Sequence, residues 1–122
     1  MIPAPDFDRL EVYQALAGIT TFIQEIHDRF PEDELPILYD RMRVAAVEAG
    51  AHLASGFARD GLDGRGLLSD TTQREVGGKL SALRHYILTA ASEFIIDEQH
   101  VFRFEALYGR AKESLCSPAG PR

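Results

Sequence analysis

The side chains with the clearest potential for chemistry are the four histidines, the single cysteine and the nineteen carboxylates. Glu48 and His52 are four residues apart, so a helix would place them on one face, where they could bind a metal ion. A zinc site needs at least three protein ligands, and no third ligand is evident in the sequence. A solvated Glu–His pair explains the spacing better, and we predict no metal site.

Two other segments resemble ligand-binding motifs only in part. Asp97 and His100 are the nearest approach to a Glu-x-x-His motif, but di-iron bundles use two such motifs and two further glutamates. The segment DGLDGRG, residues 60–66, lacks the alternating oxygen ligands of an EF-hand and the G-K-[ST] ending of a phosphate loop. We interpret it as a flexible connector and expect no cofactor.

The remaining nucleophiles and bases form no catalytic pattern. His27 and His85 have neither an orienting carboxylate pattern nor a convincing nucleophile, and no serine occupies a nucleophile elbow. Cys116 precedes the Pro/Gly-rich segment SPAGPR. As the single cysteine it cannot form a disulfide within the chain, and in this segment it cannot belong to a preorganised site. We therefore predict that the protein is not an enzyme.

The charge distribution is uneven. The net charge is −6, and residues 1–40 carry nine acidic and two basic side chains, whereas residues 41–59 carry one acidic and three basic side chains. Arg41, Arg59, Arg65 and Arg74 are the candidate contacts to nucleic acid, which is the alternative function we consider. An acidic chain repels phosphate, so we favour salt bridges, for example with the acidic residues 32–34 of a neighbouring copy.

The length and hydropathy fit a single cytoplasmic domain. A chain of 122 residues can bury a self-supporting core. No apolar run approaches the ~20 residues of a membrane span, and the first residues lack the basic and apolar regions of a signal peptide. We expect one domain over residues 1–115, a flexible tail over residues 116–122, and no membrane contact.

Four amphipathic segments must position these side chains. In each segment apolar residues recur at alternating spacings of three and four, which is one face of a helix. The spacing predicts helices over about residues 8–29, 36–59, 71–95 and 98–115, and the third stripe runs from Val76 to Phe94. Pro36 suits the first turn of the second helix. Four helices with one main stripe each predict an all-α, up-and-down antiparallel four-helix bundle.

Capping residues support three of these helix starts. Asp8 with Glu11, and Thr72 with Glu75, have the spacing of a capping box. Asp97 suits the N-cap of the last helix.

The second predicted helix is apolar on two sides. Its bundle-facing arc includes Met42, Ala45, Ala49 and Leu53, and its polar residues fill a wedge of only about 60°. We call the remaining side the second face. It consists of Arg43, Val44, Val47, Gly50, Ala51, Ala54 and Ala58.

A second apolar side implies a second packing partner, because a bundle helix needs only one apolar stripe. Small side chains let helix axes approach closely, and a glycine inside a helix costs about 1 kcal/mol relative to alanine. Identical chains are the commonest such partner. We therefore predict a homo-oligomer interface formed by Arg43, Val47, Gly50, Ala51, Ala54 and Ala58.

The same region resembles a known family. FDRLEVYQ, then FP at residues 30–31, then RMRVAAVEAGAHLASGFAR at residues 41–59 are similar to the four-helix-bundle family encoded in intervening sequences of bacterial large-subunit ribosomal RNA genes. That family includes the accessory variability proteins of diversity-generating retroelements. Its hallmark reads roughly R-R-A-A-V-S-I-P-A-N-I-A-E-G-F-G-R. The matching positions are Arg43, Ala45, Ala46, Val47, Ala51, Ala54, Gly56, Phe57 and Arg59.

The resemblance implies a bundle of this size that assembles as a ring-shaped homopentamer. The chain departs from the hallmark where Val44 replaces an arginine, Gly50 a proline and Ser55 a glutamate. The lost arginine weakens the nucleic-acid role of the retroelement branch. We therefore expect a non-enzymatic oligomeric scaffold or interaction protein, with binding of structured RNA or ribonucleoprotein as the alternative.

Overall fold

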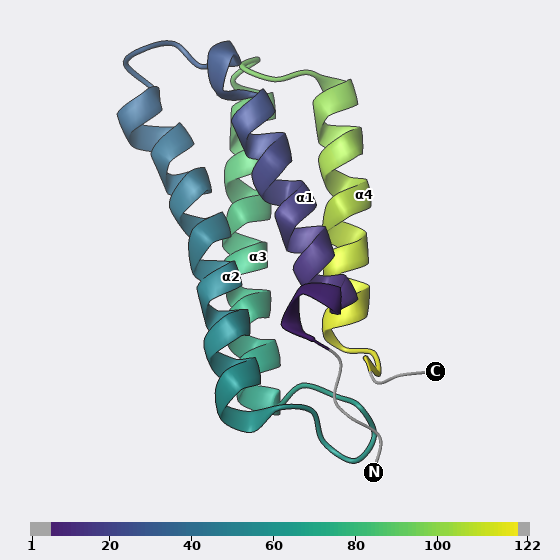
Figure 1. Ribbon diagram of the computed structural model, residues 1–122. Helices are drawn as coiled ribbons and strands as arrows, with labels where there is room; N and C mark the ends of the chain where they lie inside the picture. The colour runs from purple at the N-terminus through teal and green to yellow at the C-terminus, as the bar shows by residue number, and fades with distance from the viewer. Residues whose placement is uncertain (1–5, 120–122) are drawn as a thin grey trace.

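Four antiparallel α-helices make up most of the chain in the computed structural model, which describes residues 6–119 (Figure 1). They are α1 (Glu11–Glu25), α2 (Asp40–Asp60), α3 (Asp70–Ser92) and α4 (Glu98–Leu115). Shorter helical turns precede or follow them: η1 (Phe7–Arg9), η2 (His27–Arg29) and η3 (Leu35–Tyr39). The predicted all-α antiparallel bundle is confirmed. No helix in this part of the chain is long and apolar enough to cross a membrane.

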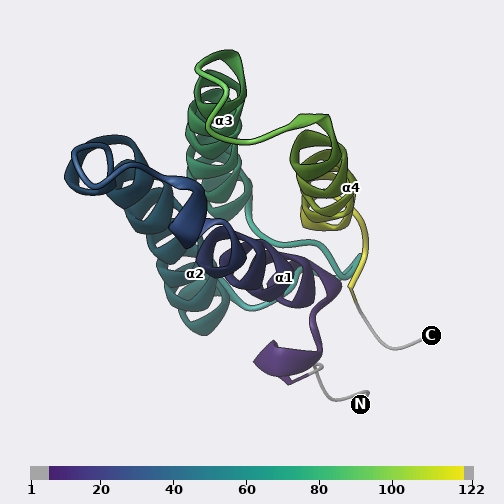
Figure 2. The same ribbon diagram turned by 90° about the horizontal axis from the view of Figure 1, so that it is seen from above.

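The helices are arranged so that α2 and α4 lie on opposite sides of the bundle, with α1 and α3 between them (Figure 2). Each of these two outer helices packs against both α1 and α3. The α1–α2 and α3–α4 connections lie at one end of the bundle, and the α2–α3 connection lies at the other end (Figure 1).

The core is built from the predicted apolar stripes. Phe22 of α1 and Phe104 of α4 meet with their ring centroids 6.0 Å apart. Large side chains from all four helices are fully buried around them, which accounts for most of the stabilisation that apolar burial provides. They include Ile19, Met42, Leu53, Leu80, Leu83, Ile87 and Leu115.

The third helix ends earlier than its apolar stripe predicts. Phe94 has a φ of 62° and is 93% exposed, so it does not belong to the core. Its N–H donates to the carbonyl of Ala91, and the N–H of Ile95 donates to the carbonyl of Ala90, both at 3.0 Å. These are the two hydrogen bonds of a Schellman motif, which normally places a glycine where Phe94 stands.

Of the three predicted helix caps, the structure confirms one. Asp97 accepts a hydrogen bond from the His100 N–H at 3.0 Å, and His100 Nδ1 accepts one from the Asp97 N–H at 3.2 Å, which completes a capping box. The cap expected at Thr72 is wrong, because Ser69 Oγ accepts from the Thr72 N–H instead. The cap expected at Asp8 is also wrong, since Leu10 precedes α1 without a side-chain cap.

Close approach of α2 and α3 depends on Gly56. A Cβ at this buried position would lie 2.7 Å from Cγ2 and 2.8 Å from Cβ of Thr72. Neither distance leaves room for a methyl group. Gly56 therefore lets the two helices pack tightly near the α2–α3 connection.

The sequence predicts a flexible connector between α2 and α3. In the structure, hydrogen bonds order this connection. The Asp63 carboxylate accepts from the Arg65 N–H at 2.8 Å and the Leu67 N–H at 3.0 Å. These donors hold the pKa of Asp63 below its usual value. The Ala119 N–H donates to the Gly66 carbonyl at 2.7 Å, so residues 116–119 of the predicted tail reach this loop.

Candidate interaction surface

The second face of α2 is exposed along the helix. Val47 is 55% exposed and Val44 is 37% exposed. A Cβ built on Gly50 would meet nothing within 4 Å, in contrast to Gly56. The six predicted interface residues therefore lie on one side of α2, because they are spaced at intervals that repeat with the turns of the helix. They are Arg43, Val47, Gly50, Ala51, Ala54 and Ala58.

Two residues of the polar side of α2, Glu48 and His52, contact α3. His52 Nδ1 lies 2.8 Å from Glu75 Oε2, and Glu48 Oε2 lies 3.0 Å from Lys79 Nζ. The solvated Glu48–His52 pair that we predicted is thus replaced by two contacts between helices. The bundle-facing arc of α2 is therefore covered, Glu48 and His52 contact α3, and most residues of the small-residue side are exposed.

A groove of about 180 Å³ lies beside the second face, between α1 and α2. Ile23, Tyr39 and Ala46 are the buried residues that line it, and Val47 and Arg43 are exposed at its border. Burial raises the pKa of Tyr39 above its usual value. The groove continues the second face because it shares Arg43 and Val47 with it.

The four arginines considered for nucleic acid do not form one patch. Arg41 and Arg59 are separated by about 27 Å along α2, at 1.5 Å per residue. Arg59 lies 2.9 Å from Asp60, and Arg65 lies 3.3 Å from Asp63. Hydrogen bonds from Arg59 and Ser69 hold the pKa of Asp60 below its usual value. The carboxylates beside two of these arginines reduce their attraction for phosphate.

The arginine of the second face has a local partner as well. Arg43 donates to Asp40 one turn earlier, at 2.8 Å. Both side chains are about half exposed, so this ion pair contributes little to stability. It nevertheless orients the Arg43 guanidinium beside the groove.

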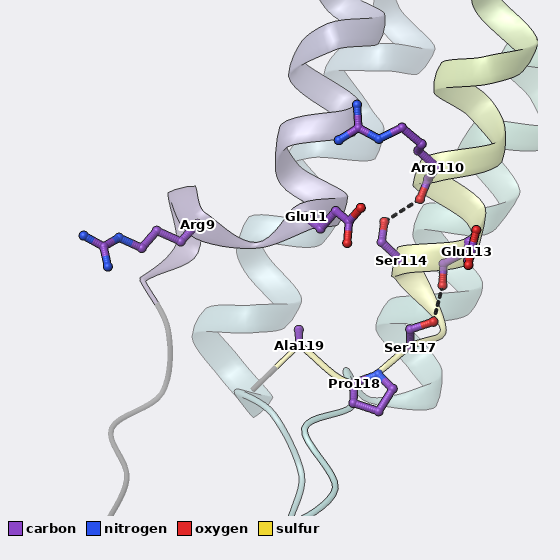
Figure 3. Close-up of a pocket in the computed structure, with 8 residues that line it drawn as sticks. All are labelled: Arg9, Glu11, Arg110, Glu113, Ser114, Ser117, Pro118 and Ala119. Carbon is purple, nitrogen blue, oxygen red and sulfur yellow. Dashed lines mark hydrogen bonds between the residues drawn. The ribbon is translucent and has the colours of Figure 1, made fainter. Parts of the chain in front are cut away.

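A polar pocket of about 390 Å³ lies between the start of α1 and the end of α4 (Figure 3). Arg110 and Glu11 extend into the space between the two helices, whereas Arg9 points away from α4 (Figure 3). Ser114 Oγ donates to the Arg110 carbonyl at 2.6 Å, and Ser117 Oγ donates to the Glu113 carbonyl at 2.7 Å. The lining residues therefore offer balanced charges and no serine activated by a base.

Three histidines have polar partners, of which two lie in contacts that link helices or cap one. His52 contacts Glu75, His100 completes the cap of α4, and His27 Nδ1 lies 3.0 Å from Asp28. Within residues 6–119, no group of three or more His, Cys, Asp or Glu side chains could hold a metal ion.

Exposed aromatic side chains are the feature that sequence reasoning missed. Phe102 is 78% exposed on α4, on the side opposite the buried Phe104. Ala106 and Gly109 are exposed on the same side of α4, and a Cβ on Gly109 would meet nothing within 4 Å. A helical wheel of residues 98–115 carries this signal, because residues two apart lie on nearly opposite sides of a helix.

Comparison with known proteins gives no relative for this chain. No protein-family model matches it, no curated protein matches it, and no solved structure matches it. The resemblance of α2 to the family encoded in ribosomal RNA intervening sequences therefore stays a prediction from its residues.

Proposed function

We propose that this protein is a non-enzymatic scaffold or interaction protein that assembles through the second face of α2 into a ring-shaped homo-oligomer. The expected number of subunits is five, which comes from the family resemblance. The observation that supports the assembly is the exposed second face of α2, where Val47 is 55% exposed and small residues, Gly50 among them, surround it. A glycine inside a helix costs about 1 kcal/mol relative to alanine, and nothing in the subunit lies near enough to require it.

The contrast between two glycines of α2 supports this argument. Gly56 has a partner within the subunit, because Thr72 occupies the space that a Cβ would fill. Gly50 lies on the exposed side, between Val47 and Ala54. Close packing of a second helix against this side would account for Gly50 in the way that Thr72 accounts for Gly56. Covering the exposed valines would add the free energy of apolar burial.

Light scattering coupled to size-exclusion chromatography tests the proposal. At micromolar concentration the protein should elute with about five times the 13.5 kDa mass of one chain. Ala54→Arg should reduce the mass to one chain and leave the circular dichroism spectrum of the helices unchanged, because Ala54 is exposed within the subunit. Ser81→Arg, an equivalent change at an exposed position of α3, should keep the wild-type mass.

A wild-type mass of one chain would refute the assembly. If Ala54→Arg kept the wild-type mass, the oligomer would use another surface. The absorbance ratio at 260 and 280 nm tests the alternative function, which is RNA binding. Nucleic acid that copurifies with the wild type but not with Arg41→Ala/Arg59→Ala would favour it. Such binding should weaken steeply as the salt concentration rises.

A further inference from the structure

We draw no further inference here: the strongest candidate, the exposed side of α4 around Phe102, is an apolar patch bordered by both Glu98 and Arg103, and nothing in the structure shows what covers it.

Discussion

Replacing Gly56 by alanine should destabilise the protein although alanine is the better helix former. The new Cβ would lie 2.7 Å from Thr72 Cγ2 and 2.8 Å from Thr72 Cβ. Thr72 is 1% exposed, and its hydroxyl lies 2.9 Å from Ser69 Oγ. A β-branched side chain held in this way has no free rotamer to adopt, so α2 and α3 must separate.

The magnitude follows from two opposing effects. Alanine gains about 1 kcal/mol of helix propensity over glycine. Overpacking of a tight contact costs about 1–3 kcal/mol, and more where backbone must move. Because the contacting atoms lie close to the α3 backbone, the upper part of that range applies, and we expect a net loss of about 1–2 kcal/mol. Gly78→Ala, where a Cβ meets nothing within 4 Å, should instead gain up to about 1 kcal/mol.

Urea unfolding monitored by circular dichroism at 222 nm measures both variants at one protein concentration. The free energies of unfolding of Gly56→Ala and Gly78→Ala should differ by about 2–3 kcal/mol, which combines the two effects. In the double variant Gly56→Ala/Thr72→Ala, the loss should be smaller than the sum of the single losses, because the contacts of the new Cβ with Oγ1 and Cγ2 of Thr72 are removed and only the contact with the Cβ remains. A Gly56→Ala protein as stable as Gly78→Ala would show that the helices are not in close contact there.

Three further changes test the caps and the core. Ser69→Ala removes the side-chain acceptor of the Thr72 N–H and should cost about 1 kcal/mol in urea unfolding. Leu83→Ala, at a position with 0% exposure, should cost about 2–5 kcal/mol and lower Tm markedly. The His100 N–H lowers the pKa of Asp97, so the charged carboxylate stabilises the folded state above its unfolded pKa of about 3.9. The stability difference between wild type and Asp97→Ala should therefore shrink as pH falls from 6 through 4 and below; a constant difference would contradict the cap.

The bundle could be predicted from the sequence because its signals are local. The bounds of α4 match the predicted 98–115, since an Asp97 cap and one apolar stripe identify that helix without reference to its neighbours. The end of α3 could not be predicted in this way. Its apolar stripe continues to Phe94, and only the backbone shows that this residue has a positive φ. A glycine there would have signalled the end of the helix.

The candidate site could likewise be predicted from the sequence where its signals are local, and not where it depends on contacts between helices. Helical spacing was sufficient to place Val47, Gly50 and Ala54 on one exposed side of α2. The partners of Glu48 and His52 lie on α3, at Lys79 and Glu75, and depend on how two helices with distant sequence positions pack together. The groove beside Val47 depends on α1 as well as α2, so no single segment of sequence reveals it.

The two ends of the described chain have a consequence for what an assembly could carry. Arg9 and Ala119 line the same pocket, at the end of the bundle opposite the starts of α2 and α4 (Figures 1 and 3). In a five-subunit ring whose axis runs along the helices, these ends would all lie on one rim. A peptide fused to either end would then be displayed in several copies on one side, where simultaneous binding multiplies a weak individual affinity into strong avidity.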